Sequence, residues 1–175
     1  MGEALDIDEH SHRFAAWAAA TGASASPACR FTVGQGKAIL EAAGFKADLR
    51  LPKQLPSPAR IDRTHAIWRR RIIKAAARHG LRFSHGVAAK LINLYLKSRF
   101  TLAGHEDNPR VAALHPPVDS LLLRAINKGL PRDRRLPTNW SKFDSTTYQR
   151  VISQLRAISA PAPFWTIETN WQGHR

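Results

Sequence analysis

The sequence predicts a mainly α-helical, two-lobed fold, and three observations support this prediction. Apolar residues recur at helical spacing in six segments, whereas only residues 164–168 show a weak strand pattern. Glycine and proline residues separate these segments. The chain has 175 residues, which suits one domain of ordinary size or two small lobes that share a core.

Residues 1–50 are predicted to form an N-terminal helical segment. The first nine residues hold four of the 13 acidic residues and are interpreted as a short acidic lead. A helix is expected from His12 to about Ala20, before the break at Gly22. Thr32 and Gln35 have capping-box spacing, so a second helix should begin there and end near Gly44.

Residues 51–60 are predicted to be a stiff, proline-rich connector between the lobes, because Pro52, Pro56 and Pro58 restrict the backbone. Residues 61–130 should form the core of the protein. A helix is expected over residues 62–79, a tight glycine hairpin over 81–86, and a strongly periodic helix over 87–97. The local pattern is therefore helix, hairpin, helix.

The rest of the chain is predicted to add two helices. Residues 99–117 are expected to loop out, with one helical turn at 110–114, before Asp119 or Pro117 opens a helix that stops at Gly129. After a basic loop, Ser145 should cap a helix that runs to about Ser159. Residues 131–175 are predicted to form a C-terminal helical segment that packs on the N-terminal lobe, with the aromatic residues of the tail as packing residues.

Positive charge is concentrated in the middle of the chain. Lysine and arginine total 27 against 13 acidic residues, a formal charge of +14. Eighteen of the basic residues but only five of the acidic ones lie in residues 51–135. This concentration indicates a phosphate-binding surface and a polyanionic partner. The alternative is a solvated basic face that only aids solubility.

Several classes of protein are disfavoured by composition. Cys29 is the only cysteine, so an internal disulfide, a four-cysteine zinc site and a cysteine-bound iron-sulfur cluster are not expected. No histidine spacing indicates a metal site, and we expect neither metal nor cofactor. The longest apolar stretch, residues 14–20, is too short to span a membrane, and no leader pattern opens the chain. A monomeric cytoplasmic protein, associated with the nucleoid and not with a membrane, is expected.

Three short motifs stand in a particular order. Gly86-Val87-Ala88-Ala89-Lys90 is followed by Pro117-Val118-Asp119, and then by Arg124. This order resembles the helix-hairpin-helix DNA glycosylases, the superfamily with endonuclease III-type and 8-oxoguanine-type enzymes. The resemblance covers about residues 83–128. Ala88 departs from it, since the family has a second hairpin glycine there. The gap from Lys90 to Asp119 is longer than in most members and similar to that of the archaeal 8-oxoguanine branch.

The resemblance implies a DNA glycosylase that also cleaves the strand at the resulting abasic site (AP lyase activity). Lys90 matches the lysine that attacks C1′ of the damaged nucleotide, and Asp119 matches the aspartate that assists it. The implied substrate is duplex DNA with a damaged base, 8-oxoguanine being favoured. Such a lysine must be neutral to react, and burial or the neighbouring cations Arg124 and Lys97 would lower its pKa.

The same resemblance and the charge pattern predict how DNA would be held. The hairpin and the surrounding basic side chains are expected to bind phosphates: Ser84, His85, Gly86, Val87, Ala88, Lys97, Arg124, Arg70, Arg71, Lys74, Arg78 and Arg82. Phe83, Trp140 and Phe143 are candidates to stack on an extruded base, and Asp144 is a candidate to accept from its edge.

Two alternatives remain open at this point. One is a non-catalytic DNA- or RNA-binding protein in which Lys90 is one more basic contact. The other is an RNA-directed nuclease or toxin component, for which the sequence contains no defined acid-base pair.

Overall fold

A computed structural model describes residues 6–24 and 29–171, and these residues are mainly helical, as predicted. No strand occurs among them. The α-helices are α1 (Ile7–Ala23), α2 (Val33–Ala42), α3 (Phe45–Asp48), α4 (Ile61–Ala77), α5 (His85–Leu96), α6 (Pro109–Ala112), α7 (Ser120–Lys128) and α8 (Ser145–Ser159). The 3-10 turns are η1 (Pro52–Gln54), η2 (Pro58–Arg60), η4 (Arg132–Arg134), η5 (Trp140–Lys142) and η6 (Phe164–Asn170), and η3 (Lys97–His105) is a π-helix.

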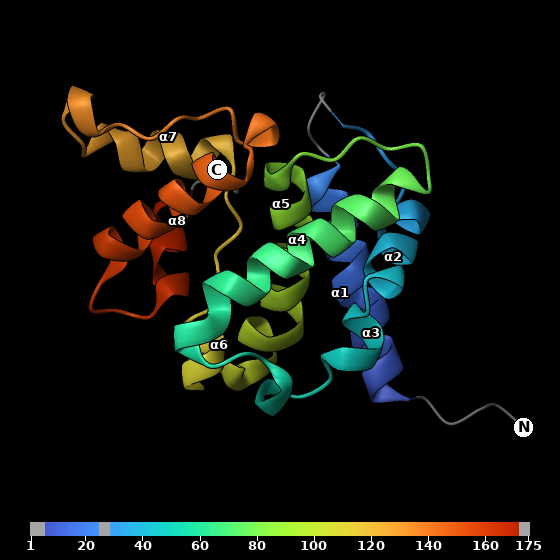
Figure 1. Cartoon of the computed structure of the whole chain (residues 1–175). Coiled ribbons are helices and arrows are strands. Elements are labelled where there is room, and N and C mark those ends of the chain that lie inside the picture. The colour runs from blue at the N-terminus through green and yellow to red at the C-terminus, as the bar shows by residue number, and fades with distance from the viewer. Residues whose placement is uncertain (1–5, 25–28, 172–175) are drawn as a thin grey trace, which may run out of the picture.

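Helix α5 lies at the centre of the fold. Helices α1 and α2 lie on one side of it, α4 crosses it, and α7 and α8 lie on the other side (Figure 1). Ten of its twelve residues are buried, including the polar Lys90 and Asn93. A helix with two faces in the sequence is therefore enclosed nearly all round, which makes its polar side chains part of the interior. The division of the chain into two lobes, with a boundary at residues 51–60, stays a prediction.

The N-terminal helix is longer than predicted. Helix α1 begins at Ile7 because the Asp6 side chain caps it by accepting from the amide of Asp8. Acidic residues in the first turn also favour the positive end of the helix dipole. Interpreting residues 7–9 as a lead was therefore wrong. In α2, by contrast, the predicted capping box of Thr32 and Gln35 is confirmed.

The connection from α4 to α5 is short and contains no strand pairing among its residues, 78–84. Gly80 has a φ of 71°, a left-handed conformation that favours glycine. Helix α5 then begins at His85, two residues earlier than predicted, because the Ser84 side chain caps it.

The predicted loop after α5 is instead a continuation of the helix. Residues 97–105 form the π-helix η3, and Gly104, with a φ of 85°, lies near its end. Arg99 and Phe100 are buried, and Arg99 binds the Asp8 side chain of α1. These contacts hold the segment against the core, so the expectation of a loop from residue 99 was wrong there.

The C-terminal elements largely begin where the sequence indicates. Asp119 caps α7, whereas α8 is capped by Asp144 and not by Ser145. Residues 164–168 belong to the 3-10 helix η6 and are not extended. Helix α8 packs against α5 and η6, and η6 packs against α7. Within residues 6–24 and 29–171, no helix is long and apolar enough to cross a membrane.

Candidate functional site

The two residues predicted to act together, Lys90 of α5 and Asp119 at the start of α7, are in contact. Lys90 Nζ lies 3.4 Å from Asp119 Oδ2, and the two side chains are only 10% and 14% exposed. Asp119 Oδ1 accepts from the amide of Leu122, at 2.9 Å. Its Oδ2 also accepts from the indole Nε1 of Trp171, at 3.1 Å. Three donors therefore hold this carboxylate in one orientation.

The Lys90–Asp119 pair lines a pocket of about 700 Å³. Helix α5 forms one wall of the pocket, the start of α7 a second, and the segment around η5 together with η6 closes it. The remaining lining residues are Gly22, Leu94, Lys97, Pro117, Ser120, Leu121, Arg124, Thr138, Asn139, Trp140, Ser141, Glu168 and Trp171. The pocket has room for a group as large as a nucleoside, directly beside the lysine.

The surroundings of Lys90 change its acidity. Burial lowers the pKa of Lys90, and the neighbouring Asp119 opposes that shift. Arg124 and Lys97, which we expected to lower the pKa, line the same pocket, but burial is the cause. Nζ also lies 4.5 Å from the centroid of the Trp140 ring, a cation–π distance.

A second ion pair in the pocket was not predicted. Lys97 of η3 donates to Glu168 Oε2 of η6. Burial raises the pKa of the Glu168 carboxyl, although Lys97 opposes this. Trp171 was predicted only to pack, whereas its indole N–H donates to Asp119. An acid and a tryptophan three positions apart in a tail carry no recognisable signal, so only the folded chain reveals their role.

The backbone amides of Gly86, Val87 and Ala88, which were predicted to belong to a hairpin or to follow it, lie in the first turn of α5 and have partners within the chain. The amide of Gly86 donates to the carbonyl oxygen of Phe143 at 3.2 Å. The amides of Val87 and Ala88 donate to the Oγ and the carbonyl oxygen of Ser84. We expected these three amides to bind a phosphate. In the structure each of them already donates a hydrogen bond within the chain, so they are not free to do so.

Gly86 has a different structural role from the predicted one. A Cβ atom at this position would lie 1.8 Å from the carbonyl oxygen of Trp140. Only glycine lets η5 approach the start of α5 so closely. The Ser84 hydroxyl adds a hydrogen bond to the carbonyl oxygen of Ser141, at 2.7 Å. The glycine thus places Trp140 next to Lys90.

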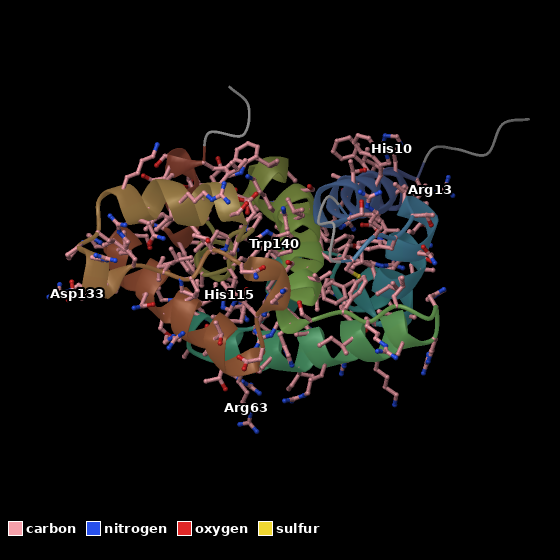
Figure 2. The ribbon with its side chains drawn as sticks, turned by 90° about the horizontal axis from the view of Figure 1, so that it is seen from above. His10, Arg13, Arg63, His115, Asp133 and Trp140 are labelled. Carbon is pink, nitrogen blue, oxygen red and sulfur yellow. The ribbon has the colours of Figure 1, made fainter. Side chains whose placement is uncertain are left out.

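The predicted phosphate-binding side chains are mostly on the surface. Those that are exposed are Arg70, Arg71, Lys74, Arg78, Arg82 and Arg124. Arg71 also lies 3.9 Å from Asp48. Figure 2 shows Arg63 pointing outward from α4, whereas Trp140 lies in the interior beside α5. Lys97 and His85 are partly buried, and Lys97 is already paired with Glu168.

Of the four candidates for contacting an extruded base, only one lines the pocket. Trp140 lines the pocket. Phe83 packs in the core against Phe31, with ring centroids 5.0 Å apart, and Phe143 is buried. The Asp144 carboxylate accepts from the amide of Thr147 as the cap of α8. Neither these two phenylalanines nor Asp144 lines the pocket.

Beside the site, a chain of buried hydrogen bonds joins α4, α5 and α8. Arg69 Nη1, which can only donate, lies 2.9 Å from His65 Nδ1, so His65 Nε2 carries the proton that Asn93 Oδ1 accepts at 2.7 Å. Asn93 Nδ2 donates to Tyr148 Oη at 3.0 Å. The Tyr148 hydroxyl lies 3.1 Å from His115 Nδ1 and donates to it.

The chain of hydrogen bonds ends at Asp62. His115 Nε2 donates to Asp62 Oδ1 at 2.8 Å, and Arg156 also binds Asp62. With both His65 and His115 neutral, each of the hydrogen bonds named above pairs one donor with one acceptor. Burial lowers the pKa of both imidazoles, in agreement with this assignment.

The chain matches no protein-family model, and we found no similar protein among curated sequences or solved structures. Among the described residues, no group of three or more histidine, cysteine, aspartate or glutamate side chains is placed to hold a metal ion.

Proposed function

We propose that this protein is a DNA glycosylase with AP lyase activity that removes a damaged base, 8-oxoguanine being favoured, from duplex DNA. The observation that carries the proposal is the Lys90–Asp119 pair at 3.4 Å in a pocket of about 700 Å³. A nucleophilic lysine needs a lowered pKa and an oriented partner, and both features are present. The motif order that resembles the helix-hairpin-helix glycosylases supports the same function.

In the proposed reaction, Lys90 Nζ reacts as a neutral amine. Its lone pair forms a bond to C1′ of the extruded nucleotide, and the C1′–N bond to the base breaks with its electron pair going to the base, which takes up a proton. The secondary amine formed then expels the ring oxygen O4′, which takes up a proton, and a protonated Schiff base results. Loss of a C2′ proton breaks the C3′–O bond by β-elimination and the 3′-phosphate leaves with the electron pair. Water then hydrolyses the Schiff base and frees Lys90. No oxidant or reductant is consumed.

Asp119 has two proposed functions in these steps. As an anion held by three donors, it stabilises the positive charge that develops on the sugar as the base departs. Its contact with Nζ also orients the lysine toward the pocket and offers an acceptor for the proton that the ammonium must lose. The exposed arginines and lysines of α4, with Arg82 and Arg124, would hold the duplex by its phosphates.

The test is reductive trapping with borohydride. Duplexes that carry 8-oxoguanine, uracil or an abasic site are incubated with the protein, and borohydride reduces any Schiff base to a stable covalent adduct. We expect an adduct with the wild-type protein and none with Lys90→Gln. Lys128→Gln is the matched control, because Lys128 is an exposed lysine of α7 outside the pocket.

A second candidate is a basic nucleic-acid-binding protein without catalysis. The observation that favours it is that Lys90 is engaged by both Asp119 and the Trp140 ring, two contacts that favour a charged ammonium. Both functions predict binding that weakens with salt, by a slope of about 0.9 per phosphate contact. Salt-sensitive binding of duplex DNA without an adduct on any of the three duplexes would establish this second function in place of the first.

A further inference from the structure

The pocket has two charged ends along one helical track. Lys90, Leu94 and Lys97 all line it, and they are spaced so that they lie on one face of α5 and its continuation η3. Seven residues of helix place the backbones of Lys90 and Lys97 about 10.5 Å apart. A nucleoside whose sugar lies at Lys90 can therefore direct the far edge of its base toward Lys97.

At this far end, the Lys97–Glu168 pair has capacity for further hydrogen bonds. Lys97 donates to Oε2 of Glu168, and no residue of the described part of the chain donates to Oε1. Oε1 is also not sealed from solvent. An ammonium has three donors, of which this pair uses one. The pair thus presents an acceptor and a donor side by side.

We propose that Lys97 and Glu168 recognise the base in the pocket by a lactam edge, in which a ring N–H stands next to a carbonyl group. This inference rests on the proposed function, because it assigns the specificity of the same pocket. Glu168 would accept from the ring N–H, and Lys97 would donate to the carbonyl oxygen. Guanine-type bases, hypoxanthine and uracil all have such an edge.

The charges of the two side chains favour this edge over others. A carbonyl oxygen is a stronger acceptor for an ammonium than a ring nitrogen, and a lactam N–H is more acidic than an exocyclic amine. Hydrogen bonds to charged groups are also the stronger ones. A base without these two groups would leave Lys97 and Glu168 partly desolvated and without a new partner, which a pocket of this kind penalises.

Glu168→Gln inverts the hydrogen bonding at the end of the pocket without changing the shape of the side chain. Lys97 can only donate, so it keeps the amide oxygen facing itself. The amide nitrogen then stands where Oε1 stood and points a donor at the N–H of the base. Glu9→Gln is the matched control, since Glu9 of α1 also pairs with a lysine, Lys46, but lines neither the pocket nor the neighbouring cavity of about 380 Å³ that Lys97 and Glu168 share.

The experiment compares two bases that differ only in the lactam atoms. Duplexes contain hypoxanthine or unsubstituted purine opposite thymine, and borohydride adducts are measured for wild type, Glu168→Gln, Lys97→Met and Glu9→Gln. We expect the wild type to prefer hypoxanthine by at least about tenfold. That preference should fall at least about tenfold in the two pocket variants and be retained in Glu9→Gln.

Direct binding provides a second readout that needs no chemistry. Inosine and purine riboside are titrated against the fluorescence of the tryptophans, two of which, Trp140 and Trp171, line the pocket. Inosine should bind more tightly than purine riboside to the wild type, and Glu168→Gln should remove the difference. No adduct on an abasic duplex would refute the proposed reaction alone. Equal binding of the two nucleosides, no binding of either, or a preference unchanged in Glu168→Gln would overturn the assignment of Lys97 and Glu168.

Discussion

Lys90 Nζ and Asp119 Oδ2 lie 3.4 Å apart although 29 positions separate them in the sequence. The same carboxylate caps α7 through Oδ1, so one side chain both starts a helix and completes the site. The chain between them includes η3 and α6, and its residues Lys97 and Pro117 line the same pocket. The position of the proposed catalytic aspartate is thus linked to the integrity of α7.

The two roles of Asp119 can be separated by substitution. Asparagine caps helices about as well as aspartate, so Asp119→Asn should keep the stability of the protein but lower borohydride trapping by at least about 100-fold. Asp119→Ala should lose trapping and also about 1 kcal/mol of unfolding free energy, because the cap is gone. Urea denaturation and trapping on an abasic duplex measure the two effects. An adduct yield for Asp119→Asn equal to that of the wild type would show that the reaction does not need the charge of Asp119.

Gly86→Ala is expected to destabilise the protein. The new Cβ would meet the Trp140 carbonyl oxygen at 1.8 Å, so η5 must move away from α5. Overpacking of this kind costs about 1–3 kcal/mol. The displacement should also change the environment of the Trp140 ring, which tryptophan fluorescence can follow.

The matched control is Gly34→Ala in α2, where the nearest atom to a new Cβ lies 3.9 Å away. This change should stabilise the protein by about 0.5–1 kcal/mol, since alanine is a better helix former than glycine. Equal stability of the two variants would show that η5 adapts without cost.

The buried histidines predict how stability depends on pH. Burial lowers the pKa of His65 and His115 in the folded protein, whereas in the unfolded chain both titrate near 6.5. Below this pH the unfolded chain binds more protons, so the free energy of unfolding should fall between pH 7 and 5, by up to about 1.4 kcal/mol per pH unit for each histidine. Denaturant titrations at several pH values measure the slope.

Glu168 is expected to change the pH dependence of the unfolding free energy in the direction opposite to the two histidines. Its raised pKa means that the folded protein binds the proton more readily, so its contribution to stability increases as the pH falls. Glu168→Gln should therefore steepen the loss of stability toward pH 5. His79→Gln, a change on the surface, should leave the slope as it is. A wild-type stability that does not change from pH 7 to pH 5 would contradict the neutral assignment of His65 and His115.

Tyr148→Phe tests the chain of buried hydrogen bonds. The variant keeps the ring but leaves Nδ2 of Asn93 with one partner fewer and Nδ1 of His115 without its donor. Leaving buried polar groups unpaired costs about 1–3 kcal/mol. Ser153→Ala, which removes an exposed hydroxyl bonded to its own helix, should cost much less. Thermal or urea unfolding measures both losses of unfolding free energy. Equal losses in the two variants would contradict the prediction.

Much of the secondary structure could be predicted from the sequence, because helix caps act within a few residues. Thr32 with Gln35, and Asp119, mark the predicted helix starts through a side chain that reaches an amide three positions away. Where the prediction was wrong, at residues 97–105, contacts of Arg99 and Phe100 with distant parts of the chain outweighed local turn signals.

The sequence by itself determined the helical class, the concentration of basic residues and the two residues that meet in the pocket. Only the tertiary structure decided what surrounds them. Packing of the other elements around α5 buries Lys90 and lowers its pKa, and the return of the C-terminal chain brings Glu168 and Trp171 to the pocket. Local patterns cannot specify such features, because burial and proximity between distant segments arise only when the elements pack together.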